Sequence, residues 1–268
     1  MKFSFLKSYA IVYLIFLFAP IVLLPLFAFN NSKIIAFPLV GFTTDWFRVM
    51  AEDPNLFHAL KNSLIIAVCA SVLATCLGLF AARATTRFTF PGKGPMTGLI
   101  MLPMVLPEII MAMSLLLVLL AIGIPLSIFT IILGHVLMCT PFAVAILSSA
   151  FQSLDRSLEE AAYDLGETPA STFRLIILPL VMPGIISSLL ISFTISLDEY
   201  IVASFLGGSD PVLSVYIYGQ FRFPARVPAI MALGTILVAV SICLLTIAEF
   251  FRRRGIAKSG GKDTGGFL

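Results

Sequence analysis

Long apolar stretches constrain this sequence more than any other feature, because each is about as long as a membrane is thick. A helix needs about 20 consecutive apolar residues to cross the hydrocarbon core of a bilayer. Six stretches reach this length, and the sequence predicts six transmembrane helices over residues 8–29, 60–82, 96–122, 126–148, 183–206 and 229–251. We therefore expect an all-α integral membrane protein in a lipid bilayer, with a transmembrane domain over residues 1–251.

The composition excludes a large soluble domain. The chain is 59% hydrophobic and 12% charged, whereas soluble domains average about 45–50% apolar and about 25% charged residues. The sequence contains no Gly-x-x-x-x-Gly-Lys-Ser/Thr loop for phosphates, and no metal-ligand cluster or Ser/His/Asp arrangement stands out. We expect a non-catalytic chain that binds no cofactor itself and has no nucleic-acid partner. If ATP drives it, the ATPase is a separate chain.

The distribution of positive charge predicts the orientation. Segments 1–7, 83–95, 149–178 and 251–268 hold 12 of the 17 Lys and Arg residues. Cytoplasmic loops of membrane proteins carry an excess of these two residues. We therefore expect both termini to be cytoplasmic, with residues 252–268 as a basic cytoplasmic tail.

A charged, helix-prone segment, residues 149–179, separates the fourth and fifth predicted spans. Residues 160–162, Glu-Ala-Ala, favour a helix, and acidic residues suit a first helical turn. Gly166 allows a turn that ends this helix, and Thr168-Pro169 is suited to cap and start a second one. Pro179 is expected to end the second helix where the next span begins. The segment thus predicts a helix–turn–helix that projects from the membrane.

The run from Glu160 to Pro179 resembles the EAA loop of importer-type ABC transporter permeases. That pattern is Glu-Ala-Ala, three residues, Gly, nine residues, Ile, one residue and Leu-Pro, and every fixed position is filled. The resemblance implies the type I ABC importer permease fold. It also implies that residues 149–179, here called the coupling segment, dock on a separate ATPase subunit that holds ATP and Mg. The implied ATPase-coupling residues are Glu160, Ala161, Ala162 and Gly166 as the contact core, with Asp164 and Arg174 at its edge.

Three acidic residues inside predicted spans are the candidates for a substrate pathway. A charge in the bilayer is costly and by default marks a functional site. Asp198 and Glu199 lie in the outer half of the fifth span, and Glu108 lies near mid-depth in the third. Pro103 and Pro107 precede Glu108 and can kink that helix. With almost no basic residue in the spans, the acids suggest a pathway for cations.

Helix geometry and chemistry leave alternatives open at these acids. Adjacent helical residues point about 100° apart, so only one of Asp198 and Glu199 is expected to face the pathway. Tyr200 offers an aromatic face for cation–π contact. The acids can instead hydrogen-bond to neighbouring spans or line an outer vestibule. His135, in the fourth span, is expected to be a structural hydrogen-bond partner.

The acidic pair, followed by VYIYGQFRF and PAIMALGTIL, resembles the spermidine/putrescine branch of these permeases, and its second permease subunit in particular. The resemblance implies polyamine translocation by alternating access across the bacterial cytoplasmic membrane. It implies as partners a homologous second permease, two ATPase copies and an external substrate-binding protein. Related permeases carry opines and amino-acid derivatives, so another small organic solute remains an alternative. A third hypothesis, from a different class of protein, is an ion-coupled secondary carrier.

Overall fold

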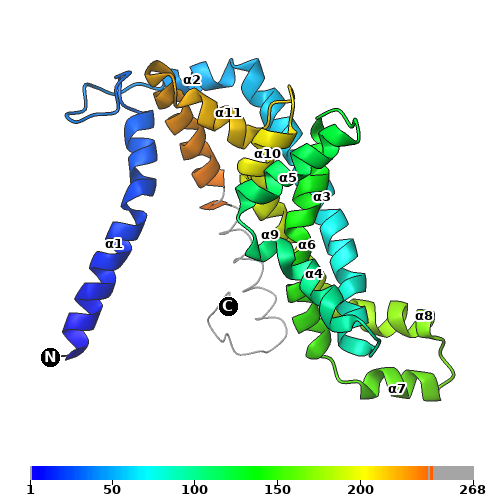
Figure 1. Ribbon diagram of the computed structural model, residues 1–268. Helices are drawn as coiled ribbons and strands as arrows, with labels where there is room; N and C mark the ends of the chain where they lie inside the picture. Colours follow the sequence, from blue (N-terminus) through cyan, green and yellow to red (C-terminus); the bar gives the residue numbers. More distant parts are fainter. Residues whose placement is uncertain (1, 241, 244–268) are drawn as a thin grey trace. The chain divides into compact units, whose positions relative to one another are not determined.

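The computed structural model describes residues 2–240 and 242–243, and the regular elements in these residues are helices (Figure 1). They are α1 (Lys2–Ala28), α2 (Asp45–Ala51), α3 (Pro54–Arg87), α4 (Lys93–Val105), α5 (Glu108–Ala121), α6 (Ile128–Gln152), α7 (Ser157–Asp164), α8 (Pro169–Thr172), a π-helix (Phe173–Ile177), α9 (Leu178–Asp198), α10 (Ile201–Leu206) and α11 (Leu213–Gln220). An apolar helix, Pro224–Val240, follows. The predicted tail over residues 252–268, and residues 244–251 of the sixth predicted span, lie outside the described residues.

Four of the described helices are long and apolar enough to cross a membrane. They are Leu6–Ala28, α3, α6 and the continuous run Pro169–Asp198. The bent pair of α4 and α5 raises the number to five if the pair is one span. The all-helical architecture is therefore confirmed, whereas the six spans and the cytoplasmic termini stay predictions.

The third predicted span is two helices rather than one. The axes of α4 and α5 are bent by 108° at Leu106 and Pro107, which have extended ψ angles of 141° and 130°. The proline ring disfavours the helical region for the residue before it, and proline has no N–H to donate. The interruption that the prolines lead us to expect is therefore present at Leu106 and Pro107, and the span over residues 96–122 stays a prediction.

The fifth predicted span is also interrupted. Helix α9 ends at Asp198, Glu199 is extended with ψ 122°, and α10 begins at Ile201. The break has no proline or glycine to cause it; the side chain of Glu199 instead bonds to the first turn of α10, as described below. The predicted span over residues 183–206 thus consists of two helical pieces, and the span itself stays a prediction.

The start of this span corrects the expectation about Pro179. The chain stays helical from Pro169 through Pro179 to Asp198, so Pro179 does not end the second helix of the coupling segment. The π-helix Phe173–Ile177 stands directly before α9. Its wider turn changes the hydrogen-bond register just where the proline lacks an N–H. The second helix of the coupling segment is thus continuous with α9.

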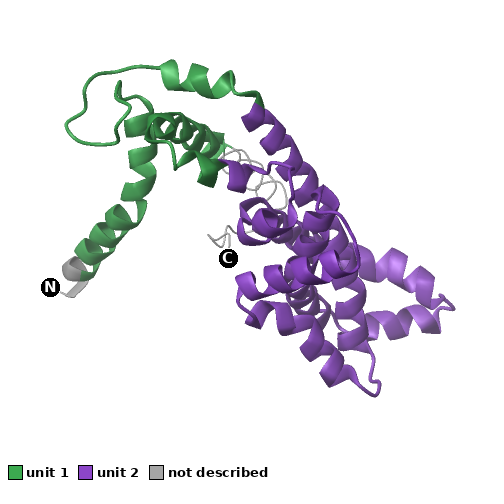
Figure 2. Ribbon diagram, turned by 45° about the horizontal axis from the view of Figure 1, so that its top comes forward, with its two compact units in different colours: residues 1–54, 217–268 green, residues 55–216 purple. Residues whose placement is uncertain are grey.

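The chain divides into two compact units, residues 1–54 with 217–268 and residues 55–216 (Figure 2). In the first unit, buried Asn30 holds the loop that follows α1. Its Oδ1 accepts a hydrogen bond from the Val40 backbone N–H at 2.9 Å, and its carbonyl accepts one from Trp46 Nε1 at 2.9 Å. The loop is therefore tied to both α1 and α2.

The second unit is built on close packing of α3, α6 and α9. Three buried serines, Ser188, Ser192 and Ser196, lie four residues apart on one face of α9. The hydroxyl of Ser188 lies 3.0 Å from that of Thr75 in α3, and Ser196 Oγ lies 2.7 Å from Nδ1 of His135 in α6. Small residues that share hydrogen bonds are typical of helix interfaces in membranes. His135 thus has the structural role expected of it.

Two apolar clusters hold the helices next to the two breaks and the coupling segment. One joins α3, α5, α6 and α10 and includes Met111, Ala112 and Val202. The other joins α3, α6, the π-helix and α9 and includes Ala82, Phe151 and Ile177. The first lies beside the interrupted helices, and the second lies under the coupling segment.

Candidate functional site

The coupling segment forms the helix–turn–helix that its sequence predicts. Gly166 has φ +87°, and its N–H donates to the carbonyl of Tyr163 at 2.9 Å while the N–H of Glu167 donates to that of Ala162 at 3.0 Å. This pair of bonds is the Schellman motif, which satisfies the last carbonyls of a helix. The hydroxyl of Thr168 accepts from the Ser171 N–H at 3.2 Å and caps α8. The turn at Gly166 and the cap at Thr168 are therefore confirmed.

The predicted ATPase-coupling residues differ in exposure. The exposed ones are Glu160, Ala161, Asp164, Gly166 and Arg174. Ala162 is only 3% exposed, because its side chain packs against the rest of this chain. The ATPase contact of all six residues, Ala162 included, stays a prediction.

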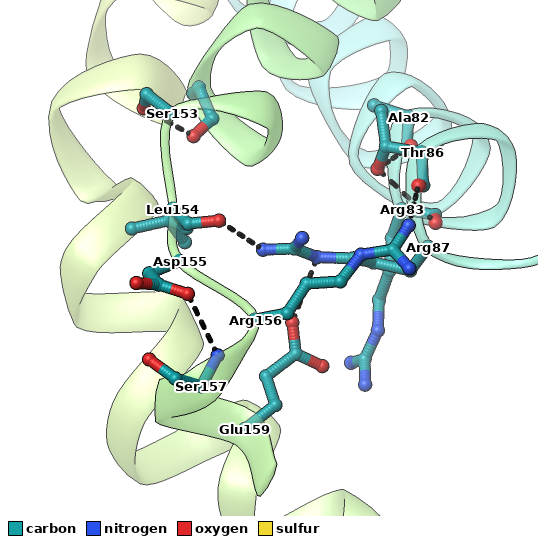
Figure 3. A network of polar contacts seen from close by, with 11 residues as sticks. Ala82, Arg83, Thr86, Arg87, Ser153, Leu154, Asp155, Arg156, Ser157 and Glu159 are labelled. Carbon is teal, nitrogen blue, oxygen red and sulfur yellow. Dashed lines mark hydrogen bonds and ion pairs between the residues drawn. The ribbon is translucent and has the colours of Figure 1, made fainter.

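Arg87, the last residue of α3, fastens the coupling segment to the rest of the second unit (Figure 3). Its Nε lies 2.8 Å from Oε1 of Glu159 in α7. Its Nη2 donates to the carbonyl of Leu154, just after α6, at 3.0 Å. The side chains of Arg87 and Glu159 are 9% and 15% exposed. One guanidinium therefore links α3, the end of α6 and α7.

Neighbouring contacts reinforce this attachment. Arg156 Nη2 donates to the carbonyl of Thr86 at 3.3 Å, and the guanidinium of Arg83 lies 4.2 Å from the centre of the Phe173 ring. The Ser157 backbone N–H, bonded to the Asp155 carboxylate at 3.0 Å, holds the pKa of Asp155 below its ordinary value. Sequence reasoning missed the pairing of Arg87 with Glu159, since no local pattern connects two residues so far apart in the chain.

Glu199 is held inside the second break. Its side chain is nearly buried, with 8% exposed, and Oε1 accepts a hydrogen bond from the Val202 N–H at 2.8 Å. Its backbone carbonyl accepts from the Ser214 hydroxyl at 2.7 Å. An acidic side chain at a helix N-terminus satisfies a free N–H and complements the helix dipole. Glu199 therefore caps α10.

The other predicted pathway residues lie at the same two breaks. Asp198 is the last residue of α9 and Glu108 the first of α5, and both are exposed in this chain. Helices α5 and α10, which carry or adjoin these acids, pack against each other in one apolar cluster. Tyr200, at the start of α10, is half-buried. The structure thus brings the first turns of α5 and α10 together, with two exposed acids and one buried acid.

This arrangement can attract and hold a cation. Each acid stands where a helix begins or ends within an apolar region, and polar groups at interrupted helices are a recurrent way to build a site at membrane depth. In residues 2–240 and 242–243, no group of three or more His, Cys, Asp or Glu side chains is arranged to hold a metal ion. The chemistry that the exposed carboxylates of Asp198 and Glu108 offer is charge pairing with a cation.

Comparison with protein families identifies the class of protein. Residues 74–255 match the binding-protein-dependent transport system inner membrane component. The chain belongs to this family. Members of the family are permease subunits of ABC importers, so the non-catalytic reading is supported by family membership.

Curated relatives cover nearly the whole permease. The putrescine transport system permease protein PotI of Escherichia coli (strain K12) is 39% identical over 259 residues, which cover 91% of this chain and 92% of that protein. The spermidine/putrescine transport system permease proteins PotC of Shigella flexneri and Haemophilus influenzae (strain Rd) are 34% and 33% identical, over 92% and 94% of this chain and 93% and 98% of their own lengths. The resemblance to the spermidine/putrescine branch is therefore confirmed.

Solved structures share the fold of this permease. A chain of a bacterial ABC transporter involved in the import of the acidic polysaccharide alginate superposes with a TM-score of 0.74, covering 93% of this chain and 96% of its own, at 15% identity. A chain of an amino acid ABC transporter with histidines covers 79% of this chain with a TM-score of 0.58, at 21% identity. At these identities the likeness concerns the fold alone.

Proposed function

We propose that this permease is the membrane-spanning subunit of an ATP-driven importer for polyamines such as putrescine and spermidine. It lies in a bacterial cytoplasmic membrane with six spans and both termini inside. It works by alternating access, in which the coupling segment follows the motion of a separate ATPase. The names of the curated relatives support the substrate class, since they are putrescine and spermidine/putrescine permeases.

The same proposal implies three kinds of partner protein. A homologous second permease completes the pathway, two copies of an ATPase subunit bind ATP and Mg, and an external substrate-binding protein delivers the polyamine. A solved relative of this fold is a bacterial alginate ABC transporter in complex with an alginate pentasaccharide-bound periplasmic protein. The exposed face of α7, with Glu160 and Asp164, is the surface offered to the ATPase.

The observation that carries the proposal is the pair of exposed acids at the two helix breaks. A polyamine carries at least two ammonium groups, and its dehydration must be offset by negative charge inside the membrane. Asp198 and Glu108 have exposed carboxylates, whereas the carboxylate of Glu199 is used as a helix cap. We assign substrate contact to Asp198 and Glu108, with Tyr200 as an aromatic neighbour, and a positioning role to Glu199.

The test is uptake of radiolabelled putrescine and spermidine in cells that lack their own importers. We expect Asp198→Asn with Glu199→Gln, and separately Glu108→Gln, to reduce uptake about tenfold or more, which corresponds to about 1.4 kcal/mol of lost stabilisation. Surface expression and basal ATPase activity should stay near the wild-type level, because both variants keep side-chain size and hydrogen-bonding oxygens.

The matched control is Glu52→Gln, which neutralises an exposed acid directly after α2. Its uptake should equal that of the wild type. Unchanged uptake in the acid variants would reduce those residues to structural groups. Uptake of a neutral or anionic solute instead of polyamines would overturn the substrate class and leave an importer for another solute. Uptake without any ATPase subunit would favour a secondary carrier.

A further inference from the structure

Helix α3 is held near its N-terminal end by hydrogen bonds to the segment that follows α10. Asn62 Nδ2 donates to the carbonyl of Pro211 at 2.8 Å, and Ser63 Oγ accepts from the Leu213 N–H at 2.8 Å. Both polar residues of α3 are buried. The next residue of that segment, Ser214, bonds to the carbonyl of Glu199. One end of α3 is therefore tied, through residues 211–214, to the break that holds the acidic pair.

The other end of α3 is tied to the coupling segment. Arg87 reaches Glu159 and the carbonyl of Leu154 (Figure 3). A charge pair that is shielded from water is screened less than a surface pair, and removing one partner leaves the other charge without compensation. Movement of α7 relative to α3 is therefore resisted by a contact that solvent cannot readily replace.

Between these two attachments α3 is one uninterrupted helix. The distance along the axis from Asn62 to Arg87 is about 38 Å at about 1.5 Å per residue, which exceeds the hydrocarbon thickness of about 30 Å. Within the second unit, the run Pro169–Asp198 also leads from the coupling segment to the break at Glu199, but it contains the π-helix Phe173–Ile177, whereas α3 is α-helical throughout. A displacement at one end of α3 is thus carried to the other end without a hinge.

We propose that α3 transmits the motion of the ATPase-bound coupling segment to the substrate acids, with Arg87 and Glu159 as the positioning residues that attach it. This inference rests on the proposed function and adds to it the route within this chain. Near the N-terminal end of α3, Asn62 and Ser63 pass the motion to residues 211–214, and Ser214 passes it to the break at Glu199. Neither Arg87 nor Glu159 touches substrate or nucleotide in this proposal.

The experiment uses the complete complex in liposomes, with binding protein loaded with putrescine or spermidine. Stimulated and basal ATP hydrolysis and polyamine uptake are measured and normalised to co-purified ATPase. The variants are Arg87→Gln, Glu159→Gln, their double mutant, and Asn62→Leu near the N-terminal end of α3. Lys93→Gln removes a positive charge from the first residue of α4, which follows α3 in the chain, and is the matched control.

We expect each single variant to lower uptake per ATP hydrolysed by about fivefold or more, the lower end of typical coupling between sites. Basal hydrolysis and the amount of bound ATPase should be unchanged, as should all activities of Lys93→Gln. The double mutant should lose no more than either single variant, because both singles break one interaction. Three outcomes would overturn this role. The losses of the two single variants could add in the double mutant, or Arg87→Gln and Glu159→Gln could show wild-type coupling. The losses could also simply follow the amount of assembled complex.

A parallel variant, Glu160→Lys, separates this inference from the importer proposal. If Glu160→Lys abolishes stimulation while the Arg87, Glu159 and Asn62 variants behave as wild type, only the route through α3 is overturned. If the wild-type complex shows no substrate-stimulated hydrolysis, the importer proposal fails and the inference fails with it.

Discussion

At the scale of single residues, Gly166 carries the strictest backbone requirement in the coupling segment. Its φ of +87° lies in the left-handed region, which costs an L-residue about 1–2 kcal/mol. No atom lies within 4 Å of the position that a Cβ would take. The requirement for glycine is therefore one of backbone conformation and not of space.

Gly166→Ala should therefore lower the stability of the turn by about 1–2 kcal/mol. The expected readout is faster hydrogen exchange over residues 157–168 in the assembled complex, together with weaker coupling to the ATPase. Gly166→Asn should lie closer to wild type, because asparagine adopts this conformation more readily. Gly94→Ala, at a helical glycine with equally open surroundings, is the control and should be neutral or slightly stabilising. Equal exchange rates in Gly166→Ala and Gly94→Ala would contradict the backbone argument.

At the scale of elements, α3 and α6 approach each other through small residues. A Cβ on Gly78 would lie 2.7 Å from Cβ and 3.0 Å from the carbonyl carbon of Ala143. Both atoms belong to the buried side of α6 and cannot turn away like the end of a long side chain. The two helices must therefore separate if residue 78 gains a side chain.

Gly78→Ala should destabilise the packed helices by about 1–3 kcal/mol, the usual cost of overpacking. The midpoint of thermal unfolding of the detergent-solubilised complex should fall. Gly98→Ala, in α4 with nothing within 4 Å of the added Cβ, makes the same chemical change and should leave the midpoint unchanged. A midpoint of Gly78→Ala equal to that of Gly98→Ala would show that the approach of α3 and α6 is less close than this structure has it.

At the scale of the whole molecule, the described chain offers one coupling segment and one set of acids. The proposed importer has an ATPase dimer with two clefts, and we propose that the coupling segment of a second permease occupies the other cleft. Two of the three break acids, Glu108 and Asp198, are exposed in this chain alone, and a second subunit can enclose them from the far side of the proposed pathway. The assembly is therefore expected to be a heterodimer of homologous permeases.

Co-expression of this permease with a homologous permease, the ATPase and the binding protein should yield a complex with one copy of each permease and two of the ATPase. The measurement is native mass spectrometry of the active, affinity-purified complex. Omission of the second permease, with all else equal, is the control and should give no polyamine-stimulated hydrolysis. An active complex that contains only this permease would refute the heterodimer.

The local parts of the structure could be predicted because their causes are local. The turn at Gly166 and the cap at Thr168 depend on neighbouring backbone groups, and both are confirmed. Pro107 marked the third span as the place of a kink, but the 108° bend exceeds what a proline alone specifies. Helicity through Pro179 was not foreseen, because it depends on the π-helix that precedes it.

By itself, the sequence determined the class of protein, the all-helical architecture and the identity of the acids, since apolar length, charge bias and the EAA spacing are properties of the chain alone. The tertiary structure decided what each acid does. Glu199 and Asp198 are adjacent and chemically alike, yet Glu199 caps α10 and bonds through its carbonyl to Ser214, while Asp198 stays exposed. The tertiary structure likewise decided the pairing of Arg87 with Glu159, because these residues lie on helices that are far apart in the sequence. Hydrogen bonds and ion pairs between residues far apart in the chain form only after the helices pack, so no local pattern can specify them.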